Sequence, residues 1–511
     1  MSFDRKQWLS IVVISAGLVA TLTAAFWAYT QDDVYITYTY SRNIAEGQGF
    51  VFNPGERVQG TTTPLYALLM SIVYRLTTDL LHAGNLLSAV FLFIACLLSL
   101  SLLRDFLSAY GRAAVVFLQV TSPLVYVSFG METLFYCSVL MLSFWLWSRE
   151  RRPAAMLTAA ALTWTRADGL VLGGTLWLLA AVEAWRSRRY AHPLFRLRAI
   201  PWRLGLIYLA AIAPWFVFAW LHFGTLLPNT FSAKQQLFSG LGFLEEGLTW
   251  WRAFYGNNPF TLLAIPLAGL GIWRATHRGQ PRLRPVAVWT VLYLAGYTAL
   301  NVNAFWYFTP LVAMLIILTV LGGEWFTQQM IGLRWSRRVV LAAALAIVIA
   351  TTGLGMASAL SYAVPPGRVE TYRLIGQWIE QNTRPDQSIL VGDLGIVGYH
   401  ARRRTRDVPG LITPDMHFKL DSYGVAKYKL DYVVATRYFT WLRVQEQDWF
   451  RYHYAPLTQI SSPGDEFSPM TVYRRRMPVE IPTQMIEGFD LPLTCSVDLR
   501  PDERLPPDTR A

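Results

Sequence analysis

Apolar runs of membrane-spanning or nearly spanning length recur through the first 360 residues. The shorter runs are long enough if the Arg and Trp residues at their ends lie at the membrane surface. The runs cover residues 8–30, 84–103, 113–129, 132–148, 153–166, 168–185, 203–223, 258–275, 285–301, 304–322 and 338–358, and a marginal run covers 64–77. This pattern predicts a mostly α-helical, polytopic membrane protein with about 11–13 transmembrane helices. The first run follows a short basic start and is interpreted as a signal anchor rather than a cleaved signal peptide.

The pattern changes after Leu360, where short strands and one amphipathic helix are predicted instead. "YRLIGQWIEQNT" predicts the helix, and "SILVGD", "LDYVVATRY" and "MTVYRRR" predict strands, with Gly and Pro between them. The glycines of "GDLGIVG" do not have the spacing of a dinucleotide fingerprint, so this stretch is interpreted as a strand and a turn without a full βαβ unit. We therefore expect a membrane domain at 1–360, an α/β domain at 361–497 and a disordered tail at 498–511.

Clustered Arg residues occupy alternate loops, and this alternation orients the helices. The clusters lie in "RDFLSAYGR", "SRERR", "WRSRRYAHPLFRLRAIPWR", "WRATHRGQPRLR" and "LRWSRR". A cytoplasmic N-terminus places every cluster inside, provided that residues 64–103 cross the membrane an odd number of times. Loop 186–203 is then cytoplasmic, whereas the first loop at 31–63, counted with the membrane domain, and the α/β domain are extracytoplasmic.

The composition narrows the possible classes of protein. The chain is 53% hydrophobic and only 15% charged, and its net charge of +12 comes from basic residues between apolar runs. Cytoplasmic anchoring explains those residues better than nucleic acid does, so no nucleic-acid partner is expected. Three cysteines do not make a disulfide framework. Walker, GxSxG, HExxH and zinc-type Cys/His patterns are absent from the sequence.

Two adjacent acids, Asp32 and Asp33, follow directly on the first apolar run. Charged groups at a membrane edge are costly unless they pair or function. One acid would serve as a general base that takes a proton from an incoming hydroxyl. The other, Asp33 in our assignment, would orient that base, hold a divalent metal such as Mg or Mn, or bind the acceptor. The alternative is a solvated helix end without a function.

Further charged and polar residues fall in the predicted outer loops. Cations there suit an anionic headgroup, because Lys and Arg bind phosphate through charge-assisted hydrogen bonds. For each cation taken singly, pairing with a lipid phosphate or a nearby acid is favoured over a catalytic task. The candidates for binding a donor phosphate are Lys234, Arg57, Arg42 and Arg166, and those for binding an acceptor or substrate are Glu132, Asp168 and Asn229.

The order of these stretches resembles the GT-C class of integral-membrane glycosyltransferases, and most closely a bacterial branch that includes cell-wall arabinofuranosyltransferases. The stretches are "DDVYITYTYSRNIAEGQGFVFNPGERVQGTTTPLY", "GMET", "TRADG", "GTLLPNTFSAK", "FWYFTPL" and "WIEQNTRPDQSILVGDLGIVGYHARRRTRDVPGL". The resemblance implies transfer, with inversion, of a hexosyl or pentosyl group from a polyprenyl phosphate. The acceptor would be a cell-envelope glycan or glycolipid outside the bacterial cytoplasmic (inner) membrane. The resemblance also implies that the catalytic acid is Asp32 or Asp33, with Asp32 favoured.

Alternatives remain beside this reading. "GERVQGTTTPLY" departs from the loop of the lipid A and protein-mannosyl branches, yet a protein or lipid A acceptor stays the nearest alternative. A transporter or lipid flippase is a rival from another class, but such proteins often have repeated halves and ionisable residues inside their spans. This chain has no internal repeat, and its candidate residues lie at outer helix ends. A membrane-anchored sensor would leave the outer loops unexplained.

Overall fold

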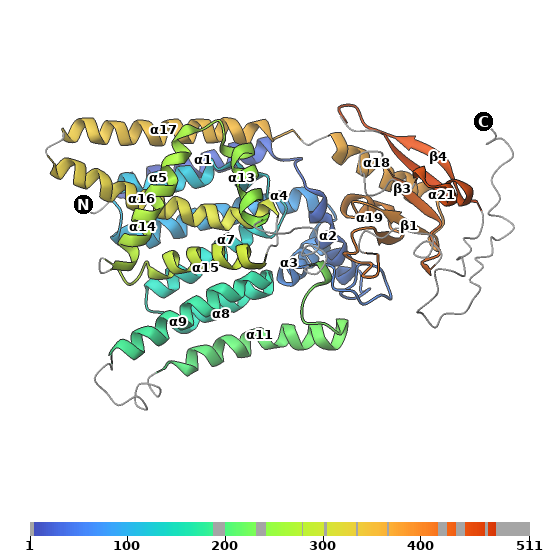
Figure 1. Cartoon of the computed structure of the whole chain (residues 1–511), viewed down its shortest axis with the longest axis horizontal. Helices are drawn as coiled ribbons and strands as arrows, with labels where there is room; N and C mark the ends of the chain where they lie inside the picture. The colour runs from blue at the N-terminus through green and yellow to red at the C-terminus, as the bar shows by residue number, and fades with distance from the viewer. Residues whose placement is uncertain are drawn as a thin grey trace. The chain divides into compact units, whose positions relative to one another are not determined.

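The computed structural model of the chain contains two compact units (Figure 1). It describes residues 5–476 except 188–199, 231–241, 278–279, 301–303, 334–335, 365–366, 417–426, 436–444 and 466–468. The first unit comprises residues 1–30, 62–226 and 234–364, and the second comprises 31–61, 227–233 and 365–511. The first loop, expected with the membrane domain, thus groups with the C-terminal residues.

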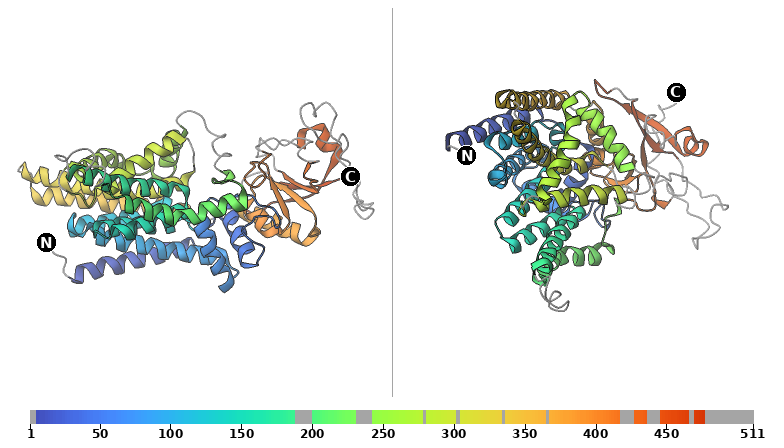
Figure 2. Two further views of the ribbon diagram at one scale, coloured as in Figure 1. Left: turned by 90° about the horizontal axis from the view of Figure 1, so that it is seen from below. Right: turned by 60° about the vertical axis from the view of Figure 1, so that its left-hand side comes forward.

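The first unit is a bundle of helices that run alongside one another (Figure 1, Figure 2). Most apolar runs of the sequence correspond to one helix each, but the run at 113–129, predicted as a single span, is divided between Ala109–Val120 and Pro123–Tyr126. The helices are α1 (Arg5–Ala25), α3 (Pro64–Leu76), α4 (Leu80–Leu102), α5 (Ala109–Val120), α6 (Pro123–Tyr126), α7 (Thr133–Ser148), α8 (Arg152–Thr165), α9 (Leu170–Ser187), α11 (Trp202–Phe223), α13 (Gly242–Tyr255), α14 (Ala264–His277), α15 (Arg284–Leu300), α16 (Phe308–Gly332) and α17 (Arg337–Ser361). Short 3₁₀ helices, η1 to η4, lie at Leu103–Asp105, Ala167–Gly169, Pro259–Leu263 and Phe305–Tyr307.

Length and composition mark the chain as a multi-pass membrane protein. Seven helices among the described residues are long and apolar enough to cross a membrane, and α3, α5 and α7 are shorter apolar helices. Leu341, Leu345 and Ile349 of α17 are exposed, which suits a helix surface that faces lipid.

Glycines allow two of these helices to touch at the backbone. A Cβ atom on Gly271 of α14 would lie 1.9 Å from the Leu318 carbonyl oxygen of α16, and one on Gly322 would lie 1.9 Å from the Leu267 oxygen. Small residues at both positions therefore permit the close approach that is typical of helices packed within membranes.

The second unit contains a five-stranded sheet in the order β2-β1-β3-β5-β4. Its strands are β1 (Ser388–Val391), β2 (Arg404–Asp407), β3 (Tyr432–Ala435), β4 (Tyr454–Ile460) and β5 (Met470–Arg475). Its helices are α2 (Asp32–Ala45), α18 (Gly367–Asn382), α19 (Gly395–Ala401) and α21 (Asp448–His453). β1 pairs in parallel with β2 and β3, whereas β5 is antiparallel to β3 and β4. Leu390, Val433 and Tyr454 belong to the core of the sheet.

The predicted helix and three predicted strands of this region are confirmed as α18, β1, β3 and β5. The interpretation of "GDLGIVG" was wrong. The strand runs through a turn into α19, and β2 then pairs in parallel with β1, which makes a compact βαβ unit. The connection is too short to resemble a standard crossover helix, so the sequence pattern hid it.

Candidate active site

The two acids open a helix instead of ending one. α1 ends at Ala25, and Asp32 and Asp33 occupy the first turn of α2. Negative side chains are favourable at this end, because the unpaired N–H groups carry the positive pole of the helix dipole. The helix itself is held by burial, since all its residues from Val34 to Asn43 are buried. The pair therefore sits on a fixed element of the second unit.

Asp32 is bound to the turn that follows β1. Its Oδ2 accepts the N–H of Gly395 at 2.9 Å, and its Oδ1 accepts the N–H of Ile396 at 2.8 Å. Burial raises the pKa of the Asp32 carboxyl well above its usual range, and the charges of Asp393 and Asp33 raise it further; the two N–H groups oppose that shift. A carboxylate with a raised pKa is a stronger base than an exposed carboxylate with the usual pKa.

Asp33 has different surroundings. Its side chain is half-buried. It makes no hydrogen bond or ion pair with any residue that the structure describes. Its carboxylate is thus available to a ligand.

Asp393 and Tyr372 are functional candidates that the sequence analysis missed. The Tyr372 hydroxyl donates a hydrogen bond to Asp393 Oδ2. Burial raises the pKa of Asp393 to about 6, with a contribution from the Asp33 charge, while the Tyr372 hydrogen bond and the charge of Arg368 oppose the shift. Asp393 follows the β1 strand after one residue, Gly392, and acids in that position often face ligands in parallel sheets. That signal was present in "SILVGD".

Three further residues predicted to bind substrate belong to the second unit. Arg42 is only 6% exposed; it donates to the Tyr399 carbonyl oxygen at 2.7 Å, and its guanidinium lies 4.6 Å from the Tyr399 ring centre. Arg57 is exposed and has no ion pair with a described residue. The Asn229 side chain donates to the carbonyl oxygens of Gly410 and Leu411, and its N–H donates to the Gln59 oxygen at 2.9 Å. Lys234 lies outside the described residues.

The remaining three predicted residues form one buried cluster in the first unit. Arg166 Nη2 lies 2.6 Å from Asp168 Oδ2, and Nη1 lies 3.7 Å from Glu132 Oε1. The hydroxyls of Tyr293 and Tyr297 donate to Asp168 Oδ2 at 3.1 and 2.6 Å. These three predicted residues therefore lie together, and Arg166 is already paired with protein carboxylates.

The residues described do not form a metal site. No group of three or more His, Cys, Asp and Glu side chains within them is arranged to hold a metal ion. The Asp32 oxygens already accept backbone N–H groups. Asp33 belongs to no such group among the described residues.

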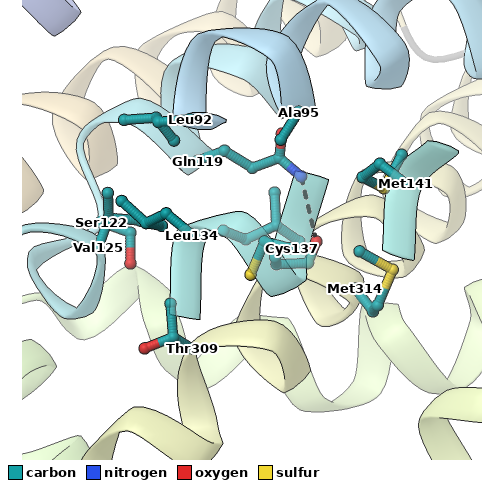
Figure 3. A pocket seen from close by; sticks show the side chains of 12 residues that line it. Leu92, Ala95, Gln119, Ser122, Val125, Leu134, Cys137, Met141, Thr309 and Met314 are labelled. Atoms are coloured by element: carbon teal, nitrogen blue, oxygen red, sulfur yellow. Dashed lines mark hydrogen bonds between the residues drawn. The ribbon is translucent and has the colours of Figure 1, made fainter. Parts of the chain in front are cut away.

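A small cavity of about 30 Å³ lies inside the helical bundle (Figure 3). Apolar side chains such as Leu134, Met141 and Met314 line it. Gln119 at its edge donates to the Ala313 oxygen at 3.3 Å. The cavity has room for about one or two water molecules, far less than a sugar or a prenyl chain requires.

Comparison with known proteins adds one matched domain and one curated relative. Residues 363–477 match a family described as "Domain of unknown function (DUF8728)". A terminal beta-(1->2)-arabinofuranosyltransferase of Corynebacterium glutamicum is 27% identical over 249 residues. That alignment covers 42% of this chain and only 36% of the relative.

Solved structures resemble the chain over nearly its whole length. ArnT of Cupriavidus metallidurans, bound to undecaprenyl phosphate, has a TM-score of 0.57 at 15% identity, covering 92% of this chain and 98% of its own. AglB of Archaeoglobus fulgidus, an oligosaccharyltransferase in complex with an inhibitory peptide and a dolichol-phosphate, has a TM-score of 0.59 at 14% identity, with 92% and 74% covered. The arabinofuranosyltransferase AftD from Mycobacteria has a TM-score of 0.52 at 14% identity, with 93% and 42% covered. The chain therefore has the GT-C fold that its sequence predicts.

Proposed function

We propose that this protein is an inverting glycosyltransferase that moves a sugar from a polyprenyl-phosphate donor to a cell-envelope glycan or glycolipid. The observation that carries the proposal is the acid pair on the first turn of α2, with Asp32 hydrogen-bonded in place and Asp33 available. The fold and the curated relative support the same class of reaction.

The chemistry needs few protein groups. The lipid phosphate is a good leaving group, so the remaining tasks are to hold it, to admit the acceptor on the opposite side and to deprotonate the acceptor hydroxyl. Asp32 is the proposed base, because its raised pKa gives it the strength to take a proton near neutral pH. Asp33, with no hydrogen-bond or ion-pair partner among the described residues, binds or orients the acceptor. Negative charge beside the reacting carbon also favours an oxocarbenium-like transition state.

Arg57 and Lys234 are the proposed ligands of the donor phosphate. Arg57 is exposed and unpaired among the described residues, as a group that receives an anionic headgroup should be. Arg42 and Arg166 are less suited, since each already binds protein groups. Glu132 and Asp168 are likewise engaged with Arg166, so their proposed role changes from acceptor binding to support of the bundle.

The proposed location is the bacterial cytoplasmic membrane, with the acid pair and the α/β domain on its outer face. The alternating Arg clusters support this orientation. A protein or lipid A acceptor is the second candidate, and the AglB structure in complex with an inhibitory peptide is a reason to test a protein acceptor. The sugar is hexosyl or pentosyl, and the curated relative favours the latter.

Purified protein incubated with a panel of radiolabelled polyprenyl-phosphate sugars tests the proposal. We expect one donor to lose its sugar, with release of the lipid phosphate, when an envelope extract supplies the acceptor. The Asp32→Asn variant is the matched control for contaminating activity. Equal release by wild type and variant with every donor would contradict the proposal.

A further inference from the structure

The region that matches a domain of unknown function contributes a short turn to the acid pair. This turn runs from Gly392, after β1, into Gly395 and Ile396, the first two residues of α19, and it lies in the same compact unit as α2. We propose that the turn is a working part of the catalytic centre, in which Gly395 and Ile396 position Asp32 while Asp393, held by Tyr372, acts on the same carboxylate. The inference rests on the glycosyl transfer proposed above, and it gives the C-terminal domain a task in catalysis.

The backbone of the turn fixes the orientation of Asp32. The two carboxylate oxygens accept one N–H each, at 2.9 and 2.8 Å, so the group cannot rotate without losing a bond. Each oxygen retains a second lone pair for an incoming hydroxyl. A base held this way needs no rearrangement when the acceptor arrives, and pre-orientation of this kind contributes strongly to rate.

The close approach of the turn to α2 requires a glycine. A Cβ atom on Gly395 would lie 1.8 Å from the main-chain oxygen of Asp32 and 2.8 Å from its Oδ2. The nearer atom belongs to the backbone, which cannot move aside as a flexible side chain could. Any larger residue at this position must therefore push the turn away from Asp32.

Asp393 adds negative charge beside the pair. Its charge is the strongest one acting on Asp32, and Asp33 acts on both. Arg368 is the cation that opposes Asp393, but its Nε also lies 3.4 Å from Asp465 Oδ1. Arg368 thus offsets the charge of Asp393 only in part, and the remaining negative charge raises the pKa of Asp32. Tyr372 holds Asp393 in this position through its hydroxyl.

The place of Asp393 in the sheet agrees with such a role. β1 has β2 on one side and β3 on the other, both parallel to it, and Asp393 follows the carboxyl end of β1. In open α/β sheets, ligands bind at the carboxyl ends of strands where the chain changes direction in this way. The carboxyl end of β1, followed by Asp393, therefore belongs to the same compact unit as the acid pair.

The decisive measurement is kcat against pH for Asp393→Asn. The amide still accepts the Tyr372 hydroxyl but carries no charge, so the pKa of Asp32 should fall and the acid limb of the profile should move to lower pH by about one unit. At neutral pH kcat should decrease, since the base is weaker. Tyr372→Phe should shift the limb in the same direction by less, because Asp393 then remains protonated to higher pH.

Asp431→Asn provides the matched control. Asp431 binds Ser388 and Arg475 at the opposite ends of the strands, with no role in the proposed centre. It should lower the melting temperature and leave the pH profile unchanged. Unchanged profiles for folded Asp393→Asn and Tyr372→Phe would overturn the role given to Asp393.

Gly395→Ala tests the positioning role separately. We expect kcat to fall by about tenfold or more while the donor KM stays near the wild-type value. Wild-type kcat in this variant would overturn that role.

If Asp32→Asn abolishes transfer while all variants of the turn behave as wild type, this inference fails and the proposed function stands. If wild-type protein transfers no sugar, the proposed function fails first.

Discussion

Asp32 and Asp33 are adjacent in the chain, yet their carboxylates have different partners. Consecutive residues of a helix project about 100° apart, so one acid can face a neighbouring turn while the other does not. Asp32 faces the backbone of Gly395 and Ile396, whereas Asp33 has no protein partner among the described residues. The two acids are thus suited to different tasks.

Asp32→Asn should lower the rate of transfer by roughly 10²- to 10⁴-fold, the usual contribution of a general base. The amide cannot take the proton and can accept only one of the two N–H groups. Asp33→Asn should cause a smaller loss, through weaker binding of the acceptor. Single-turnover rates with a saturating donor would compare the two variants. A larger loss for Asp33→Asn would exchange the roles, and full activity in the double variant would leave no base on α2.

Replacement of the two proposed phosphate ligands should affect donor binding alone. Arg57→Ala and Lys234→Ala should each raise the KM for the donor roughly tenfold or more, as expected when a charged hydrogen bond is lost. Arg42→Ala is the contrasting variant, since it removes a buried bond to Tyr399 and should lower the melting temperature. Donor titrations and thermal unfolding in detergent would measure both effects. Unchanged donor KM in both variants would shift the assignment to other cations.

At the scale of elements, the cluster of Arg166, Asp168 and Glu132 joins α7, α8 and the 3₁₀ helix η2. The two tyrosines that bond Asp168 come from α15. Removing one partner of a buried ion pair leaves the other uncompensated, at a cost of roughly 3–5 kcal/mol. Asp168→Asn should therefore lower the melting temperature markedly, whereas Glu150→Gln, at an exposed ion pair, should change it little. Equal melting temperatures for the two variants would mean that the cluster does not stabilise the bundle.

The elements were more predictable than the partners of their side chains. Long apolar runs and the strand at "SILVGD" are local patterns, so α17 and β1 could be predicted from a window of residues. The bond between Asp32 and Gly395 joins residues more than 360 positions apart, and no local pattern specifies such a pair. Arg166 differs, because its nearer partner, Asp168, stands two positions away in "TRADG", whereas Glu132 is distant in the chain and could not be assigned to it from the sequence.

At the scale of the molecule, the second unit is assembled from distant parts of the chain. Residues 31–61 and 227–233 group with residues 365–511. The Asn53 side chain donates a hydrogen bond to the Thr405 carbonyl oxygen and accepts one from the Thr405 N–H. Both carboxylate oxygens of Glu56 accept hydrogen bonds from the Arg406 guanidinium. The expected division at residue 360 counted the first loop with the membrane helices, whereas in the structure this loop packs with the C-terminal residues.

This assembly constrains the topology, because all parts of one compact unit must lie on the same side of the membrane. The Arg clusters predict that this side is the outer one and that loop 186–203 is cytoplasmic. A cysteine introduced at Gln48, which is exposed, should react with a membrane-impermeant thiol reagent in intact cells, and one at Arg189 should react only after permeabilisation. A probe at Arg402, the exposed residue that follows α19, should behave as the Gln48 probe does. The native cysteines Cys96, Cys137 and Cys495 are first replaced with Ser or Ala, so that the introduced cysteine alone can react. Labelling of Arg189 but not of Gln48 in intact cells would invert the orientation, and with it the side of the membrane on which the acceptor must be sought.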